Sequence, residues 1–265
     1  MKPQFIIGAA SSGSGKTTFT MGLLRALAHR GMRVQPYKCG PDYIDTQFHS
    51  LASKQVSVNL DTWLASEEHV RSLYHSYGKD ADVCTVEGVM GLYDGYSGMK
   101  GSSAAMAALL DIPVILLVNA RSTAYSVAPL ISGFARFSPD VRIAGVVFNQ
   151  VSSPSHYEYL KEACRDIGME CLGYIPNTPT LKVPSRHLGL ALGTQKRMDA
   201  QMNLAAELIE KYVDVDRLLE ITSCPFVNGV EENAPHVTMT IAVAKDAAFN
   251  FVYRENIAQL NRLGS

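Results

Sequence analysis

The 265-residue sequence lacks any run of basic residues and any long hydrophobic run. Its 24 lysines and arginines are scattered, and the formal net charge is −1. A nearly neutral chain gives no electrostatic footprint for nucleic acid or for an anionic membrane surface. The apolar stretch 112–118 contains Pro113 and is far shorter than the ~20 residues that span a bilayer. We therefore expect neither a nucleic-acid partner nor a membrane span.

Cysteine is also scarce. The five cysteines are odd in number, widely spaced and free of any CxxC pair (Cys39, Cys84, Cys164, Cys171 and Cys224). This argues against a disulfide framework and against a zinc cage, and it is typical of the reducing cytoplasm. The start of the chain is too short before its first glycine to be a signal peptide. We therefore expect a cytoplasmic protein.

Short β-branched or apolar runs alternate with longer segments of helical period, which indicates a mostly parallel sheet flanked by helices. The predicted strands are 5–9, 33–37, 82–87, 114–119, 143–148 and 170–174. The predicted helices are 16–29, 67–77, 102–110, 124–137, 154–167, 196–212 and 214–221. The pattern predicts an α/β domain over residues 1–223.

The character of the sequence changes after this domain. Residues 224–237 are polar, contain two prolines and are typical of a linker. Residues 238–244 predict a fresh strand, and 250–263 have helical period with an asparagine at the start. One strand and one helix cannot bury a core of their own. We therefore expect residues 238–265 to open a second, truncated domain.

The strongest motif joins the first predicted strand to the first predicted helix, where residues 9–18 have the sequence AASSGSGKTT. The Walker A pattern is a glycine, four residues, and then Gly-Lys-Ser/Thr. Ala10 departs from it at the leading position, and the remaining positions fit. Glycines let successive N–H groups turn toward phosphate oxygens, and the helix adds its positive N-terminal end. With a strand directly before it and a helix directly after it, the loop predicts bound ATP in place of a plain turn.

Several residues of this loop are expected to contact the nucleotide. They are Ser12, Gly13, Ser14, Gly15, Lys16, Thr17 and Thr18. Lys16 would reach the β- and γ-phosphates, and the Thr17 hydroxyl would bind Mg²⁺. Partitioning ATPases of the same broad class carry a second lysine near the start of the loop, where this chain has Ser11 and Ser12. That difference argues against an ATP-driven dimeric switch.

Acidic residues follow the second predicted strand, which Lys38 closes. Asp42 and Asp45 are three positions apart after Pro41, so one helical turn would place both on one face. Open α/β sheets bind ligands just past the carboxyl ends of their strands. Two interpretations remain open: a pair of site carboxylates, or a helix cap at Asp42 with a solvated Asp45.

Other polar residues end later strands. Glu87 closes the third predicted strand and is the expected second anchor for Mg²⁺ or its waters. Asp94 either reaches across the site or forms the turn in LYDG. Asn149 either contacts the adenine edge through its two-sided amide or is a turn residue. Cys39, Cys84 and His49 are interpreted as structural or loop residues.

A set of motifs resembles the family of cobyrinic acid a,c-diamide synthases. The motifs are SSGSGKTT, KCGPDYIDTQFH, VEGVMGLYDG, VPSRHLGL and IAVAKDAAFNFVYRENI, and the resemblance runs from residue 5 to the end of the chain. Members have an N-terminal synthetase domain of the P-loop NTPase fold, similar to dethiobiotin synthetase, and then a class I glutamine amidotransferase domain. They convert the c and then the a acetate side chains of the macrocycle to amides, with ATP and glutamine, in cobalamin biosynthesis.

The resemblance implies that a substrate carboxylate is phosphorylated and that ammonia then displaces the phosphate. Asp45 and Glu87 would support Mg²⁺ beside Thr17. Asp42 and Asp94 would face the substrate carboxylate or help handle the ammonia.

Further roles follow from the same resemblance. Lys38 would neutralise the negative charge of the γ-phosphate or of the substrate carboxylate. Lys16 would hold the triphosphate beside it. Three further residues are expected to face the macrocycle: Tyr43, Arg186 and His187. An ordinary surface turn is the alternative for the last two.

The family's ammonia source needs a nucleophilic cysteine in a sharp strand-to-helix turn, and none of the five cysteines has that setting. We therefore expect this chain to amidate with supplied ammonia only. Three alternatives remain: another tetrapyrrole substrate (hydrogenobyrinic acid or nickel-sirohydrochlorin), a ligase of the dethiobiotin type, and a ParA/MinD-like switch ATPase. By analogy within the fold class, a homodimer is also expected.

Overall fold

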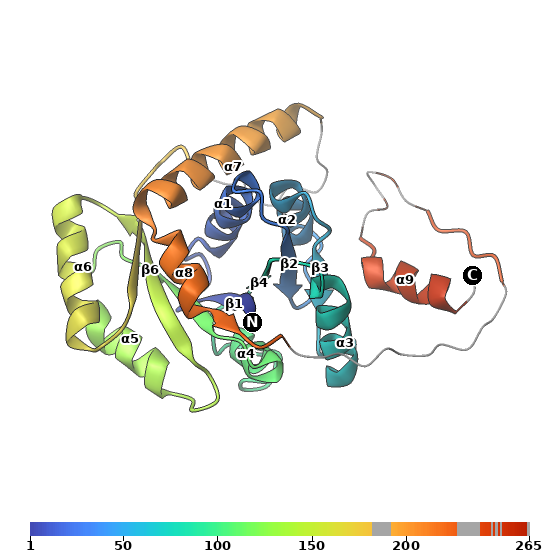
Figure 1. Cartoon of the computed structure of the whole chain (residues 1–265), viewed down its shortest axis with the longest axis horizontal. Helices are drawn as coiled ribbons and strands as arrows, with labels where there is room; N and C mark the ends of the chain where they lie inside the picture. Colours follow the sequence, from blue (N-terminus) through green and yellow to red (C-terminus); the bar gives the residue numbers. More distant parts are fainter. Residues whose placement is uncertain (182–191, 227–238, 245, 247–248, 250, 264–265) are drawn as a thin grey trace.

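A parallel β-sheet lies at the centre of the computed structural model, which describes residues 1–181, 192–226, 239–244, 246, 249 and 251–263 (Figure 1). The strand order is β3-β2-β4-β1-β5-β6-β7, and every neighbouring pair in it is parallel. The strands are β1 (Lys2–Ala9), β2 (Val34–Cys39), β3 (Val58–Leu60), β4 (Val83–Glu87), β5 (Val114–Asn119), β6 (Ile143–Val151) and β7 (Cys171–Pro176). A short strand, β8 (Ser223–Cys224), pairs antiparallel with the start of β1.

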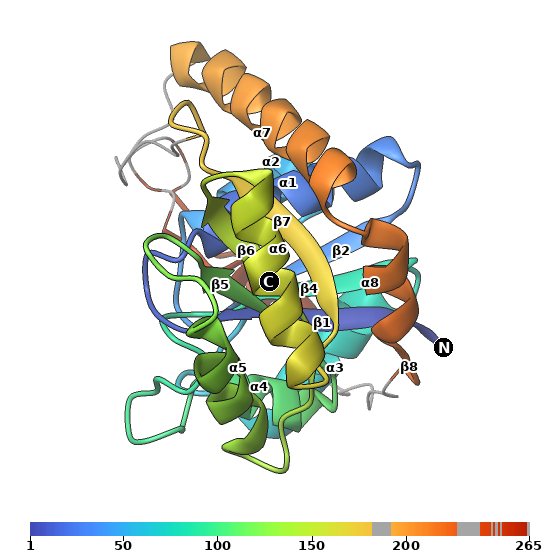
Figure 2. The same cartoon turned by 90° about the vertical axis from the view of Figure 1, so that its left-hand side faces the viewer.

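Helices cover both faces of the sheet. They are α1 (Lys16–His29), α2 (Asp45–Ser53), α3 (Glu67–Gly78), α4 (Ser103–Leu110), α5 (Val127–Arg136), α6 (Pro154–Asp166), α7 (Leu192–Tyr212) and α8 (Val215–Ile221). A further helix, α9 (Arg254–Arg262), is set apart from the sheet (Figure 1). Buried residues of α1, α7 and α8 pack on one face, and those of α3 to α6 pack on the other. Figure 2 shows α1, α2 and α7 on one side of the sheet and α4 and α5 on the opposite side. The predicted three-layer α/β fold is therefore confirmed.

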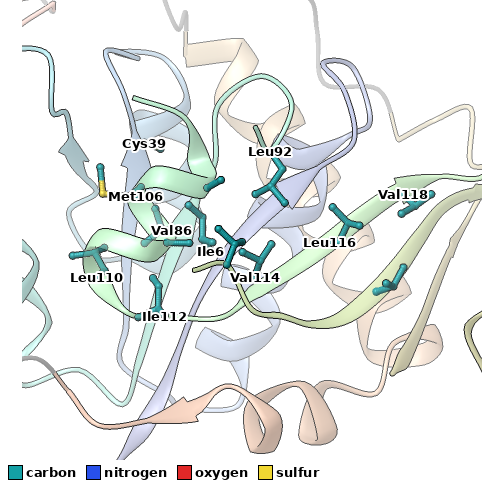
Figure 3. Packing of buried hydrophobic residues seen from close by; sticks show 14 of the residues in the cluster. Ile6, Cys39, Val86, Leu92, Met106, Leu110, Ile112, Val114, Leu116 and Val118 are labelled. Atoms are coloured by element: carbon teal, nitrogen blue, oxygen red, sulfur yellow. The ribbon is translucent and has the colours of Figure 1, made fainter. Parts of the chain in front are cut away.

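Two cores result because successive side chains of a strand point to opposite faces. Phe5 and Ile7 of β1 face the α1 layer, whereas Ile6 between them faces the other layer. In Figure 3, Ile6 lies among apolar side chains that include Val86, Val114 and Leu110. A sheet buried on both faces needs nearly continuous apolar strands, and this explains why its strands are easy to recognise in the sequence.

Serine caps fix where several helices begin. Ser66, Ser102 and Ser153 each accept a hydrogen bond from the backbone N–H three residues further on. Such a cap satisfies one of the free donors at a helix start. The helices that follow begin at Glu67, Ser103 and Pro154, each within one residue of its predicted start.

The strand predicted for 238–244 is wrong over the part that the structure describes. Residues 239–244 are exposed and form no strand. Helix α9 falls inside the predicted helix 250–263. The division into two domains with a linker between them stays a prediction. Among the described residues, no helix is both long and apolar enough to cross a membrane.

Candidate functional site

The loop between β1 and α1 has the backbone of a phosphate cradle. Gly13 and Gly15 have φ angles of 76° and 95°, in the left-handed region where a side chain is strained. A Cβ at Gly15 would also lie 2.2 Å from the Nδ2 atom of Asn149. Lys16 and Thr17 follow at once as the first residues of α1. The glycines are therefore required where the sequence places them.

A cleft of 720 Å³ opens in front of this loop, at the carboxyl ends of β2 and β4. Most of the residues expected to bind nucleotide and metal line it: Ser12, Gly13, Gly15, Lys16, Thr17, Thr18, Lys38, Asp42, Asp45 and Glu87. Ser14 also lies in the loop, but it is 1% exposed, and its hydroxyl donates to the carbonyl of Ser11. The cleft therefore gathers residues from three separate segments of the chain.

Lys38, Asp45 and Glu87 form a buried charge cluster beside the loop. The register of the sheet sets Lys38 of β2 opposite Glu87 of β4. The Lys38 Nζ atom lies 2.9 Å from Asp45 Oδ2 and 2.9 Å from Glu87 Oε1. The Thr17 hydroxyl donates to Glu87 Oε1 at 2.9 Å and lies 3.5 Å from Asp45 Oδ2. The structure thus brings Thr17, Asp45 and Glu87 together.

His49 belongs to the same cluster, although the sequence suggested only a structural role. It is fully buried, and its Nε2 atom lies 2.7 Å from Glu87 Oε2. Its Nδ1 atom lies 3.4 Å from the hydroxyl of Ser57. The sequence holds one signal for this contact: His49 follows Asp45 by four residues, which is one turn of α2 and therefore the same helix face.

Burial and mutual charge shift the pKa values in the cluster. Burial, reinforced by the negative charge of Glu87, raises the pKa of Asp45 to about 6. Burial also acts to raise the pKa of Glu87, but Lys38 and His49 outweigh it and hold that pKa below its usual range. For Lys38, burial opposes the charged form, yet the two carboxylates raise its pKa above the ordinary value. Burial lowers the pKa of Lys16.

The Lys16 ammonium donates a hydrogen bond to the backbone carbonyl of Met90. Met90 lies in the loop after β4 and has a φ angle of 47°, which is unusual for a residue other than glycine. A phosphate in the cleft would compete with this carbonyl for the ammonium. The loop after β4 is therefore coupled directly to the phosphate loop.

Asp42 and Asp94 each accept hydrogen bonds from backbone N–H groups close to them in the sequence. Asp42 Oδ1 accepts hydrogen bonds from the N–H groups of Ile44 and Asp45, both at 2.9 Å, ahead of α2. Asp94 Oδ2 accepts one from the N–H of Gly91 at 2.9 Å. Asp42 thus satisfies backbone donors at the start of α2, and it also lines the cleft. The solvated Asp45 that went with the helix-cap interpretation is wrong, because Asp45 is buried and pairs with Lys38. Asp94 forms a turn.

Asn149 lies behind the phosphate loop. Its Nδ2 atom donates to the carbonyl of Ser14 at 2.8 Å, and its Oδ1 atom accepts from the N–H of Gln150 at 2.9 Å. The side-chain amide therefore supports the loop backbone in this structure, and its predicted contact with adenine stays a prediction.

Tyr43 is the residue expected to face the macrocycle that the structure describes, and it does not line the cleft. Tyr43 lines a neighbouring cavity of 770 Å³ on the other side of α2. Its ring stacks on those of Phe251 and Tyr253, with centroids 5.0 and 4.8 Å away. Arg186 and His187 lie outside the residues that the structure describes.

The donor atoms around Thr17 suit Mg²⁺. This ion prefers oxygen ligands, keeps several waters and is commonly held by one or two carboxylates together with phosphate oxygens. Thr17, Asp45 and Glu87 offer a hydroxyl and two carboxylates within one cluster. No group of three or more His, Cys, Asp or Glu forms a complete metal site in the part of the chain that the structure describes. A nucleotide-bound Mg²⁺ needs no such group.

Comparisons with known proteins agree with a nucleotide site. Residues 5–190 match the family described as "CobQ/CobB/MinD/ParA nucleotide binding domain". The cobyrinate a,c-diamide synthase of Streptococcus sanguinis is 43% identical over 272 residues, covering 98% of this chain and 59% of that protein. Those of Salmonella typhimurium and Caldanaerobacter subterraneus are 41% and 40% identical, with the same coverages. The chain therefore spans 59% of the length of these relatives.

Proposed function

Because the chain belongs to the CobQ/CobB/MinD/ParA nucleotide-binding domain family, we propose that it uses ATP to activate the a and c acetate carboxylates of cobyrinic acid for amidation. One observation of the structure supports this most: the convergence of Thr17, Asp45 and Glu87 beside a phosphate loop. The reaction and the substrate in this proposal are those in the name of the relatives, cobyrinate a,c-diamide synthase.

The reaction needs activation because a carboxylate is a poor acyl donor, whose leaving group would be oxide. In the first step a carboxylate oxygen attacks the γ-phosphorus of ATP, and ADP leaves. In the second step ammonia attacks the acyl carbon, phosphate leaves, and the nitrogen loses a proton to give the amide. The protein's task is to position these groups and to offset the developing negative charge.

The residues of the cleft divide this task. Lys16 would leave the Met90 carbonyl and bind the β- and γ-phosphate oxygens. Thr17, Asp45 and Glu87 would hold Mg²⁺, which neutralises phosphate charge when bound.

Two further residues keep these carboxylates in place. Lys38 contacts Asp45 and Glu87 at 2.9 Å each, so it fixes their orientation from behind. His49 does the same for the second oxygen of Glu87. Both are positioning residues in this proposal.

Ammonia would normally come from glutamine in a longer protein of this family. Cys39 ends β2 shortly before α2, but it is 1% exposed and burial raises the pKa of its thiol to about 12. A buried thiol of that kind is a poor nucleophile. Cys39 is therefore no candidate for a glutaminase nucleophile. We propose that these 265 residues use free ammonia and do not hydrolyse glutamine.

The test is an assay of the purified chain with MgATP, ammonium ions and cobyrinic acid. We expect ADP release that depends on the ring, and amide products in the mass spectrum. Hydrogenobyrinic acid and nickel-sirohydrochlorin, used in parallel, identify the preferred macrocycle. Glutamine in place of ammonium ions should give no amide. An ATP turnover rate that none of the three macrocycles changes, but that rises with DNA or lipid vesicles, would contradict the proposal and indicate a switch ATPase.

A further inference from the structure

Two loops beside the cleft expose large apolar side chains. The loop after β3 carries Trp63 and Leu64, which are 69% and 63% exposed. The loop after β4 carries Met90, Tyr96 and Met99, with exposures between 40% and 54%. Large exposed apolar side chains that gather in one region mark interaction sites.

Trp63 and Tyr96 connect these two loops. Their ring centroids are 4.9 Å apart, and the rings meet edge to face at 77°. The N–H of Trp63 donates to Asp61 Oδ1, and the N–H of Tyr96 donates to the carbonyl of Lys100. The Tyr96 ring lies over Gly101, where a Cβ would come within 2.6 Å of it. The pair is therefore held in place although both rings face solvent.

The pair lies at the same edge of the sheet as the cleft. Strands β3, β2 and β4 are adjacent and parallel, so the loops after them leave the sheet side by side. The loop after β2 supplies Asp42 and Asp45 to the cleft. The loop after β4 runs from Glu87, past the Met90 carbonyl that holds Lys16, to Tyr96. The aromatic pair thus stands on loops that leave the sheet at the same edge as the phosphate site.

We propose that Trp63 and Tyr96 form the platform for the ring of the tetrapyrrole whose carboxylate is activated in the cleft, an inference that rests on the proposed function. Only one carboxylate side chain of so large a substrate has to reach the γ-phosphate. The macrocycle that carries this side chain then rests on the protein surface beside the cleft. Trp and Tyr give such a ring a large, rigid contact area at little conformational cost. Lys100 is exposed beside Tyr96 and offers an ammonium to other acid arms of the ring.

The experiment uses the fluorescence of Trp63, which is the single tryptophan of the chain. Cobyrinic acid should quench its emission in a saturable titration of the full 265-residue chain. Tyr96→Ala should weaken ring binding by ~tenfold, the loss expected for removing one side of an aromatic contact. Tyr159→Ala is the matched control, because Tyr159 is 58% exposed on α6, and it should leave ring binding unchanged. Neither variant should change ATP affinity.

The outcomes separate this inference from the proposed function. Ring binding that depends on Tyr96, without ADP release, would support the platform and contradict the proposed reaction. ADP release with a ring affinity that Tyr96→Ala leaves unchanged would overturn the platform and leave the reaction standing. A molar mass that falls in Tyr96→Ala, with unchanged ring binding, would also overturn it, because the surface would then be an interface between copies of the chain.

Discussion

At the residue scale, Lys38 is the group on which the buried charge cluster depends. Its ammonium is the cation shared by Asp45 and Glu87, and all three side chains are at most 7% exposed. Removing one partner of a buried ion pair is costly because it leaves an uncompensated charge in a poorly solvated place.

We expect Lys38→Met to lower the free energy of unfolding by about 3 kcal/mol, since Asp45 and Glu87 would then lose the buried ammonium that they share. Urea unfolding monitored by circular dichroism measures this loss. Lys161→Met on the exposed surface of α6 is the control and should change stability by less than ~0.5 kcal/mol. Equal stabilities for the two variants would show that Lys38 is not essential to the cluster.

A second prediction at this scale concerns Cys171, which is half-buried. A hydrogen bond from Cys164, aided by one from Tyr157, lowers the pKa of its thiol to about 7. Burial instead raises the pKa of Cys39 and Cys84 to about 12. Because the thiolate is the reactive form, iodoacetamide should alkylate Cys171 first, with a rate that rises through about pH 7.

Peptide mass mapping at a series of pH values locates the modified thiol. Cys171→Ser should remove the fast reaction, and Cys39→Ser should leave it unchanged. Fast alkylation of Cys39 in the folded chain would contradict the burial described here.

At the scale of elements, the contact between α1 and α7 depends on a glycine. A Cβ at Gly22 would lie 2.8 Å from both Ala205 Cβ and Ile209 Cδ1 of α7. Gly133 of α5 has no atom within 4 Å of the place where its Cβ would be. The two glycines therefore separate the effect of packing from that of helix propensity.

Gly133→Ala should raise the free energy of unfolding by up to ~1 kcal/mol, because alanine favours the helix. Gly22→Val should lower it by ~1–3 kcal/mol, because the added atoms force α1 and α7 apart. Thermal unfolding of both variants beside the wild type gives the comparison. A Gly22→Val variant as stable as Gly133→Ala would mean that the two helices do not pack as closely as described.

Element prediction succeeded where local signals were strong. The strand 114–119 and the helix 16–29 match β5 and α1 to the residue, because one is a buried apolar run and the other follows a glycine-rich loop. The three-residue β3 and two-residue β8 were missed, since strands so short show no alternation. The strand predicted at 238–244 was wrong at 239–244, because β-branched residues alone do not fix a strand without packing around them.

The sequence predicted those parts of the candidate site that lie just after the carboxyl ends of strands. The motif located Lys16 and Thr17, and the order of strands and loops located Asp45 and Glu87 near them. The contact of His49 with Glu87 could not be deduced in the same way, because it depends on how α2 packs on the sheet. For Asp94, the sequence LYDG after a strand predicts a turn and a site residue equally well, so the sequence could not separate the two roles.

At the scale of the whole molecule, the sheet order explains why distant segments share one site. β1, β4 and β2 are neighbours in space although α1, α2, β3 and α3 separate them in the sequence. Their carboxyl ends therefore meet at one edge, as in other open α/β sheets that bind ligands there. Pairing of two copies, the cytoplasmic location and the two-domain division remain predictions at this scale.

The most direct test of the central claim is the effect of Mg²⁺ on ATP affinity, measured by isothermal titration calorimetry. We expect Mg²⁺ to tighten ATP binding to the wild type and to the exposed-surface control Glu158→Gln by the same factor. In Asp45→Asn and in Glu87→Gln that factor should fall by ~tenfold or more, the equivalent of about 1.4 kcal/mol per lost ligand. An undiminished Mg²⁺ effect in both variants would contradict the claim that these two carboxylates hold the metal beside Thr17.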